Sequence, residues 1–223
     1  MYKTTEILSL EHTLAAPLLS KFDYPWQALP EIGAFILQLG ATLSSDDYDC
    51  PAEQVWIAKT ATVAPGASIT GPCIIGAETE VRHGAFIRGN ALIGRCCVVG
   101  NSAELKNVIL FDGVQTPHYN YVGDSILGWR AHMGAGSITS NVKGDHSLVA
   151  VKNGDEIIDT ELKKFGAILG DRAEIGCNSV LNPGCVIGRD ATVYPLSSVR
   201  GVVASGCIYK AEGNVVEKLT IEN

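Results

Sequence analysis

Aliphatic residues recur at every sixth position over a long stretch of this chain. The first run consists of nine residues: Ile57, Val63, Ile69, Ile75, Val81, Ile87, Ile93, Val99 and Leu105. A small residue follows each of the first eight by four positions: Ala61, Ala67, Cys73, Thr79, Ala85, Ala91, Cys97 and Ala103. Residues i and i+6 lie on opposite faces of an α-helix, so this period is not helical. It predicts short strands and corners, three of each completing a triangular coil of about 18 residues.

The period is interrupted at three places. It shortens by one residue between Leu105 and Leu110 and again between Val122 and Leu127. After Thr139 it is lost, and it returns at Leu169, Ile175, Leu181, Ile187, Val193 and Val199. We name the three coil faces A, B and C in chain order. Face A then holds Ile87, Leu105, Val122 and Thr139, face C holds Val99, Thr116 and Met133, and Leu169 restarts the pattern on face B.

Three segments lack the repeat and predict additions to the solenoid of residues 56–203. Residues 1–55 contain helix-compatible apolar spacing at 9–22 and at 30–43, the latter with Pro30 near its first turn, so we expect a helical cap over the first coil. Residues 140–166 contain two β-rich stretches around Asn153-Gly154, which predict a hairpin arm projecting from the solenoid. Residues 204–223 become polar and predict a C-terminal cap.

Composition narrows the classes of partner and compartment. The chain has 17 basic and 24 acidic residues, a formal net charge of −7, which argues against a nucleic-acid partner. No apolar run approaches the roughly 18 residues needed to span a bilayer, and the first residues do not resemble an export signal. The seven cysteines follow no zinc or redox spacing, which predicts reduced thiols in the cytoplasm.

Polar residues converge at one corner of the predicted coil. Arg88 and Lys106 each follow a face A aliphatic on adjacent coils, roughly 5 Å apart at sheet spacing. They either extend separately into water or hold a phosphate between them. His118 ends face C and Tyr121 opens the next face A, so both lie at the corner nearest Lys106. His118 is a candidate general base near neutral pH, or an ordinary turn residue.

Three further residues occupy the same coil position as His118, namely Ala135, Cys177 and Pro195. This column of four positions spans about 15 Å at sheet spacing, comparable with an extended pantetheine arm. It is a candidate cofactor groove, and ordinary corner packing explains it equally well. The five histidines contain no close HxxxxH pair, so we predict no metal site.

Three segments carry a family resemblance: GNSAELKN at 100–107, TPHYNYVGDS at 116–125 and MGAGSITSN at 133–141. Over about residues 57–203 the chain resembles the C-terminal acetyltransferase domain of the bifunctional enzymes that acetylate glucosamine 1-phosphate and uridylylate the product. It also resembles related archaeal sugar-phosphate enzymes with the same arm. The resemblance implies a left-handed β-helix, a homotrimer with active sites between subunits, and acetyl-CoA as co-substrate. The first 55 residues are too few for a uridylyltransferase half.

The resemblance also implies residue roles. Arg88 and Lys106 match phosphate-binding cations, His118 the catalytic base, Tyr121 a sugar ligand, Asn141 a residue near the acetyl group and Ala135 a coenzyme A contact. Cys177 and Pro195 extend the coenzyme A column, and His132 takes a substrate-binding position. Three positions depart from the family: His132 replaces an asparagine, Val142 a tyrosine and Ser147 a lysine.

Two functions follow from these residues. The first is an acetyl-CoA-dependent N-acetyltransferase that acts on an amino-sugar phosphate such as glucosamine 1-phosphate, in the biosynthesis of nucleotide sugars such as UDP-N-acetylglucosamine. The second is a non-catalytic trimer that binds sugar phosphates or nucleotide sugars, or that partners a separate nucleotidyltransferase. The base and the two cations favour the enzyme, whereas the three departures favour the binding protein.

Overall fold

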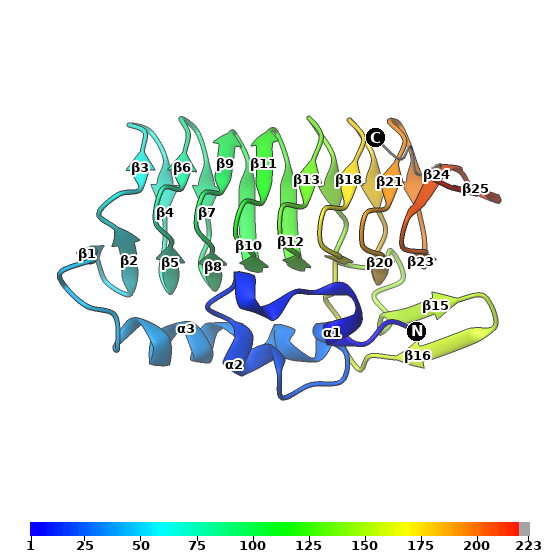
Figure 1. Cartoon of the computed structure of the whole chain (residues 1–223), viewed down its shortest axis with the longest axis horizontal. Helices are drawn as coiled ribbons and strands as arrows, with labels where there is room; N and C mark the ends of the chain where they lie inside the picture. Colours follow the sequence, from blue (N-terminus) through cyan, green and yellow to red (C-terminus); the bar gives the residue numbers. More distant parts are fainter. Residues whose placement is uncertain (219–223) are drawn as a thin grey trace, which may run out of the picture.

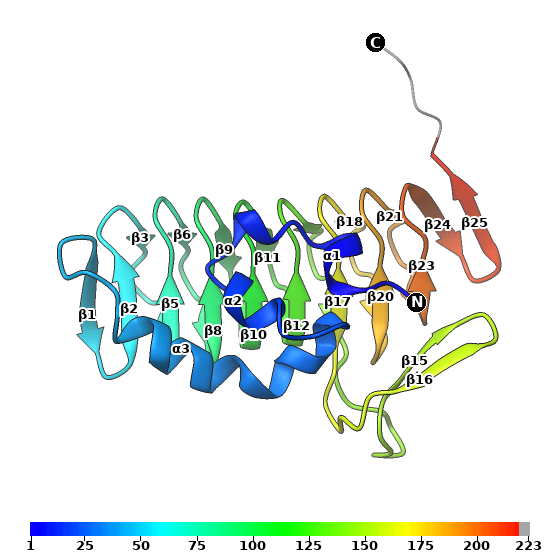
Figure 2. The same cartoon turned by 60° about the horizontal axis from the view of Figure 1, so that its bottom comes forward.

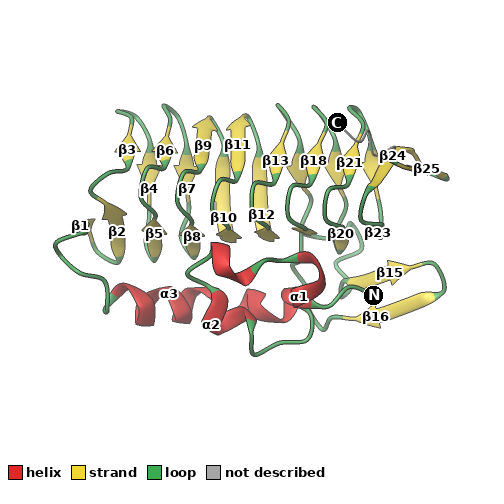
Figure 3. Ribbon diagram, viewed as in Figure 1, coloured by secondary structure: helices red, strands yellow, loops and turns green. Residues whose placement is uncertain are grey.

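The computed structural model describes residues 1–218 and shows a solenoid of stacked triangular coils with helices along one side (Figures 1 and 3). Its strands are parallel from coil to coil, and the fold is a left-handed parallel β-helix, which confirms the fold predicted above. No helix within residues 1–218 is both long and apolar enough to cross a bilayer.

Each face of the solenoid is a ladder of short strands. Face A contains β4 (Ser68–Ile69), β7 (Phe86–Ile87), the first part of β10 (Glu104–Leu110) and of β12 (Tyr121–Leu127), β14 (Ile138–Thr139), β19 (Val180–Leu181) and β22 (Ser198–Val199). Face B contains β2 (Val55–Ala58), β5 (Cys73–Ile75), β8 (Ala91–Ile93), the second part of β10 and β12, β17 (Ala167–Leu169), β20 (Cys185–Ile187) and β23 (Val202–Val203). Face C contains β3 (Thr62–Val63), β6 (Glu80–Val81), β9 (Val98–Asn101), β11 (Gln115–His118), β13 (His132–Met133), β18 (Glu174–Ile175), β21 (Thr192–Val193) and β24 (Cys207–Ala211).

Strand registers confirm the predicted stacking of coils. On face A, Leu105 pairs with Ile87 on one side and with Val122 on the other. On face B, Leu127 pairs with Leu169, so the ladder resumes after the arm where the returning period placed it. From Ile75 onward the repeated side chains are buried along the solenoid axis, whereas Ile57, Val63 and Ile69 at the open first coil are half-buried. The buried side chains form the continuous core that no single coil could provide.

The two five-residue units form tight corners between faces A and B. β10 and β12 each turn this corner at one residue, Asn107 in β10 and Asp124 in β12. Their φ angles are +55° and +47°, in the left-handed region that Asn and Asp adopt more readily than other non-glycine residues. The shortened period therefore marks two stacked corners whose residue types suit the backbone there.

The N-terminal segment lies along face B, as Figure 2 shows. It consists of α1 (Thr4–Ile7), η1 (Leu10–His12), α2 (Ala16–Leu19), η2 (Pro25–Glu31) and α3 (Ile32–Gly40), where η denotes a 3-10 helix. The helix expected over residues 9–22 is divided into η1 and α2, and α3 begins only at Ile32, after Pro30 in η2. The predicted position over the first coil is wrong, because β1 (Tyr48–Ala52) pairs antiparallel with β2 at that end.

Outward-facing residues of face B explain where the helices lie. In most strands of this face the residue before the inward aliphatic is also aliphatic, and these side chains are buried: Ile74, Leu92, Ile109, Ile126, Ile168 and Val186. Strands that are apolar on both sides must be covered on both sides. α3 contacts β5, β8 and β10, and η2 contacts β12. Face B is therefore sealed beneath the N-terminal segment.

One buried carboxylate anchors the N-terminal segment to the solenoid. Asp171 is fully buried, and its Oδ2 accepts hydrogen bonds from Ser9 N at 3.0 Å and Ser9 Oγ at 2.6 Å. Its Oδ1 accepts one from Trp129 N at 2.9 Å, and Arg189 lies 3.3 Å from Oδ2. Nearby, the ring of His12 stacks on Trp129 with centroids 4.3 Å apart. Segments far apart in the chain thus meet at one coil.

Two hairpins complete the structure. The arm is formed by β15 (Ala150–Asn153) and β16 (Glu156–Asp159), as predicted, but Asn153 pairs with Glu156, so the turn is Gly154-Asp155, one residue later than expected. Gly154 has a φ of +59°, which the first position of such a turn favours. Also near the last coils, β24 pairs with β25 (Asn214–Glu217). Residues 219–223 of the predicted C-terminal cap lie outside the described residues.

Candidate functional site

Two of the predicted site residues, Lys106 and Asn141, hydrogen-bond to Asp124 at the corner between faces A and B. Its carboxylate accepts hydrogen bonds from Lys106 Nζ at 3.1 and 3.3 Å, from Asn107 Nδ2 at 3.0 Å and from Asn141 Nδ2 at 2.5 Å. Only 6% of the Asp124 side chain is exposed. The charge-assisted bonds fix the orientation of Lys106 and Asn141. Sequence reasoning assigned Asp124 no role, although it lies within the family segment at 116–125 and within a five-residue unit.

Tyr121 lies against the same cluster. A Cβ added to Gly123 would lie 2.5 Å from the Tyr121 hydroxyl and 2.9 Å from Asn141 Nδ2, so only glycine leaves room for both groups. Burial raises the pKa of Tyr121, and the Asp124 carboxylate adds to this increase, while a hydrogen bond from Asn141 opposes it. The phenol therefore remains protonated at neutral pH and can donate a hydrogen bond.

The two predicted phosphate-binding cations are neighbours, and each already has a carboxylate partner. Arg88 donates to Glu104 Oε1 at 2.7 Å, and its main-chain N–H bonds to Leu105 O, next to Lys106. Lys106 pairs with Asp124. The sequence predicted either that the two cations extend into water or that they hold a phosphate between them. Neither alternative included these carboxylate partners. The Lys106 ammonium and the Arg88 guanidinium each retain further N–H donors.

His118 lies at the corner that leads into Tyr121. Its main-chain N–H donates to Asn120 Oδ1 at 3.1 Å, and Asn120 Nδ2 donates to Gly134 O at 2.9 Å and Ser137 O at 3.1 Å. Asn120 is buried, so it fixes the backbone between the candidate base and the candidate sugar ligand. The His118 imidazole is exposed and has no hydrogen-bond partner among residues 1–218.

Backbone hydrogen bonds place the proposed column residues on successive coils. Gly136 N donates to His118 O at 2.9 Å, Asn178 N to Ala135 O at 2.8 Å, and Leu196 N to Cys177 O at 2.9 Å. Pro195 follows in the same register, because Ile175 pairs with Val193. His118, Ala135, Cys177 and Pro195 therefore form a continuous corner. Whether a cofactor lies along it stays a prediction.

The structure does not bring His132 into the Asp124 cluster. Its Nδ1 lies 2.8 Å from Glu174 Oε2, on the outer surface of face C. By contrast, Lys143 lies near the start of the arm, the part of the chain where the family resemblance expects a lysine. Its Nζ lies 2.5 Å from the Ser147 hydroxyl. Sequence reasoning considered only Gly144 to Ser147, and therefore missed the ammonium of Lys143.

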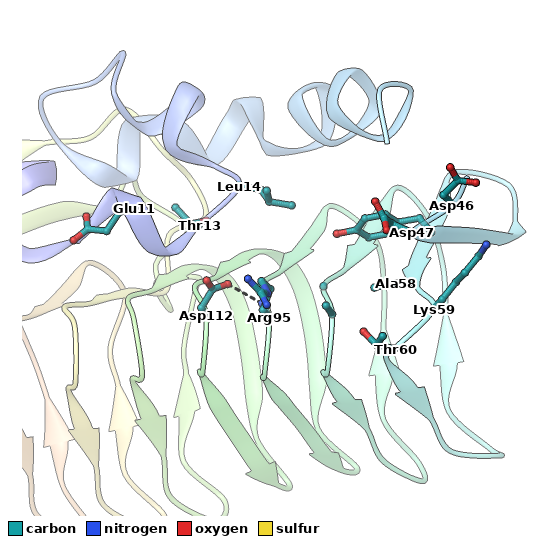
Figure 4. A pocket seen from close by; sticks show the side chains of 14 residues that line it. Glu11, Thr13, Leu14, Asp46, Asp47, Ala58, Lys59, Thr60, Arg95 and Asp112 are labelled. Atoms are coloured by element: carbon teal, nitrogen blue, oxygen red, sulfur yellow. Dashed lines mark hydrogen bonds between the residues drawn. The ribbon is translucent and has the colours of Figure 1, made fainter. Parts of the chain in front are cut away.

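A separate cavity lies between the N-terminal segment and the first coils (Figure 4). Its volume is about 490 Å³, and it is lined by charged residues of both signs, including Asp47, Lys59, Arg95 and Asp112. None of the predicted site residues lines it. Within residues 1–218, no group of three or more His, Cys, Asp or Glu residues is arranged to hold a metal ion.

Comparisons with known proteins confirm the resemblance inferred from the motifs. A family model described as the GMPPB C-terminal domain matches residues 69–161. The chain is 32% identical over 141 residues to the bifunctional protein GlmU of Synechococcus elongatus, covering 63% of this chain and 27% of that protein. It is 29% identical over 198 residues to GlmU of Methanococcus maripaludis strain S2, covering 87% of this chain and 48% of that protein. The chain thus spans less than half the length of these relatives.

Solved structures with a similar chain path include a hexapeptide transferase family protein from Anaplasma phagocytophilum. It is 16% identical, with a TM-score of 0.48, and the match covers 74% of this chain and 80% of that one. Another is the acetyltransferase domain of PglB from Neisseria gonorrhoeae in complex with acetyl coenzyme A. It is also 16% identical, with a TM-score of 0.34, covering 74% of this chain and 58% of that one.

Proposed function

We propose that this protein is an acyltransferase that moves an acetyl group from acetyl-CoA to the amine of an amino-sugar phosphate such as glucosamine 1-phosphate, in nucleotide-sugar biosynthesis. The observation that carries the proposal is the Asp124 cluster, which holds Lys106 and Asn141 beside Tyr121, one strand from His118. Similarity to the GlmU proteins supports it. The match to the GMPPB C-terminal domain adds support for the same part of the chain.

In the proposed reaction Arg88 and Lys106 bind the phosphate through their remaining N–H donors, and Tyr121 contacts the sugar, whereas His132, which pairs with Glu174 on face C, takes no part. The amine attacks the thioester carbonyl, a C–N bond forms, and the C–S bond breaks as the thiolate leaves. His118 accepts the proton that the amine loses. Asn141 keeps one amide N–H on Asp124, and its second N–H turns from Tyr121 to the acetyl oxygen as negative charge develops there.

Coenzyme A would follow the column of Ala135, Cys177 and Pro195, with its thiol end at His118. We infer from the resemblance that this site lies between the subunits of a homotrimer. Light scattering should therefore give a mass three times the 23.6 kDa of the chain. A monomeric mass at micromolar concentration would contradict a site between subunits.

A non-catalytic sugar-phosphate or nucleotide-sugar binding protein, or a partner of a separate nucleotidyltransferase, is the second candidate. One observation favours it: no group within residues 1–218 hydrogen-bonds to the His118 ring and orients it. A general base usually has such a partner. Binding alone would need only the donors of the Asp124 cluster and Arg88.

The test is the release of free thiol from acetyl-CoA in the presence of a panel of amino-sugar phosphates. His118→Ala should reduce the rate by about 100- to 10,000-fold, the range for loss of a general base. Its affinity for the sugar phosphate, measured by calorimetry, should change little because Arg88 and Lys106 remain.

His83→Ala is the matched control. His83 occupies the same corner position two coils earlier, where Asn101 Nδ2 donates to its main-chain oxygen at 3.0 Å. Its rate should equal that of the unmodified protein. If the unmodified protein turns over no amino-sugar phosphate, the binding protein becomes the better explanation. If His118→Ala keeps the full rate, His118 is not the base.

A further inference from the structure

A second group of basic side chains lies between the arm and the last coils. Two adjoining cavities of about 360 and 390 Å³ share Lys143, Asn182, Pro183 and Arg200 in their walls. Lys152, from β15 of the arm, completes the first of them. We call these two cavities together the arm pocket. Its three cations come from the start of the arm, from the arm hairpin and from the end of β22.

Glycines hold the arm close to the coils and so fix the shape of the arm pocket. A Cβ added to Gly201 would lie 2.6 Å from Lys152 O, and one added to Gly184 would lie 2.9 Å from Ala150 O. Between these two contacts, Val151 is fully buried. The backbone at Lys152 is therefore in close contact with the corner that contains Arg200. The shape of the arm pocket is therefore set by backbone packing and not only by the conformations of long side chains.

The charges in the arm pocket are not neutralised as they are around Asp124. Within residues 1–218, neither Lys152 nor Arg200 forms an ion pair or a side-chain hydrogen bond. Lys143 is 3.8 Å from Asp145, which lines only the second cavity. The walls of the first cavity contain no carboxylate. Cations that line the same cavity repel one another unless an anion lies between them. In a chain of net charge −7 such a pocket is also unusual.

We propose that the arm pocket binds the diphosphate group of a small molecule. Three cations spread over two adjoining cavities match two linked phosphates, whereas one phosphate would leave a cation unmatched. Arg200 follows β22 and Pro195 precedes it, so the arm pocket lies at the other end of this strand from the His118 column. The arm pocket therefore lies away from the His118 column but next to the Asp124 cluster, since Ser140 and Val142 of the second cavity flank Asn141. The proposed diphosphate site does not depend on acetyl transfer.

The experiment is calorimetric titration of the full chain with inorganic pyrophosphate, with inorganic phosphate and with a nucleoside diphosphate, in the absence of acetyl-CoA and sugar. Arg200→Gln and Lys152→Gln should each weaken pyrophosphate binding by about 10- to 100-fold, as expected for loss of a charge-assisted hydrogen bond. Inorganic phosphate should bind more weakly than pyrophosphate. Raising the salt concentration should weaken binding as well.

Two control variants locate the effect. Lys164→Gln removes an exposed cation that lines neither cavity, and Lys106→Gln removes the cation of the Asp124 cluster. Lys164→Gln should bind pyrophosphate as the unmodified protein does, and Lys106→Gln should lose only the anion binding that occurs at the Asp124 cluster. Arg200→Lys keeps the charge without the planar fork, and should lie between Arg200→Gln and the unmodified protein.

The relative affinities of the ligands identify the source of the diphosphate, and the variants test the proposal itself. Tighter binding of the nucleoside diphosphate than of pyrophosphate identifies a nucleotide as the ligand, and the reverse order identifies free pyrophosphate. Pyrophosphate affinity that is unchanged in both Arg200→Gln and Lys152→Gln overturns the proposal. So does an affinity that disappears in Lys106→Gln, because the anion would then be bound at the Asp124 cluster.

Discussion

Faces A and B are built from the same repeat and meet at the same corner, yet one is sealed and the other carries the polar site. The difference lies in the residue before each inward aliphatic. On face B this residue is itself aliphatic, as Leu92 is in β8, and only 1% of Leu92 is exposed. On face A it is mixed, and Phe86 of the same coil is 41% exposed. The inward residues thus build the solenoid, and their outward neighbours decide what each face does.

The largest expected difference is between the thiol reactivity of buried cysteines on face B and that of an exposed cysteine outside it. Burial raises the pKa of Cys73 and of Cys185, both on face B, to about 12. Since the thiolate is the reactive form, their alkylation near pH 8 should be slower than that of exposed Cys177 by about 1000-fold or more. Mass spectrometry of the native protein after brief treatment with iodoacetamide measures this. Equal labelling of Cys73 and Cys177 would mean that face B opens readily.

A matched pair of truncations in one coil tests the sealed face directly. Leu92→Ala should lower the free energy of unfolding by about 2 to 5 kcal/mol, because it leaves a cavity beneath α3. Phe86→Ala, on face A, should cost less, about 1 kcal/mol, because 41% of the residue is already exposed to water. Urea denaturation followed by circular dichroism measures both. Similar losses would show that an interface covers face A as closely as helices cover face B.

The Asp124 corner joins the two faces and should respond between these extremes. Asp124→Asn keeps the shape but replaces a carboxylate that accepts four hydrogen bonds, so a loss of about 1 to 3 kcal/mol is expected. Glu104→Gln, which removes the exposed partner of Arg88, is the control and should cost under about 1 kcal/mol. Thermal melting compares them. A stable Asp124→Asn protein would mean that the cluster contributes to binding and little to the fold.

The smallest effect is expected at the far corner of face B. A hydrogen bond from Arg172 lowers the pKa of Asp190, so the pair stabilises the fold above the unfolded-state pKa of about 3.9 and loses that contribution as pH falls through the lower folded-state value. Both side chains are nearly half exposed, which limits the contribution to under about 1 kcal/mol. Asp190→Asn should therefore lower stability slightly at pH 7 and not at pH 2. An equal loss at both pH values would show that charge is not the cause.

Much of the fold follows from the sequence because the geometry of a six-residue period leaves few choices. The pairing of Leu105 with Ile87 and Val122, and the return of the ladder at Leu169, could be counted from the printed residues. The position of the helices was also encoded, in doubled aliphatics such as Ile74-Ile75 and Leu92-Ile93. Reading only the inward residue of each pair hid that signal.

The candidate site was less predictable because it depends on side-chain reach. Counting along the coils placed Lys106 next to Arg88, but could not reveal that Asp124 and Glu104 would pair with them. Likewise, Lys143 reaches the Ser147 hydroxyl through its own flexible chain. Position in the sequence fixes where a Cα lies, whereas a terminal ammonium can settle several ångströms away, where the local charges favour it.

The contact between Asp171 and Ser9 limits where coils can be added to this solenoid. Successive coils are near copies of one another, so a segment lying along them could slip by one coil, about 4.8 Å, and still meet aliphatic side chains. Asp171 prevents this because it binds Ser9 at a single level. Duplication of a coil after residue 190 would leave this anchor and the helices undisturbed. Duplication between β5 and β12 would separate Ser9 from the coils that α3 covers, so the number of coils there is fixed by the length of the N-terminal segment.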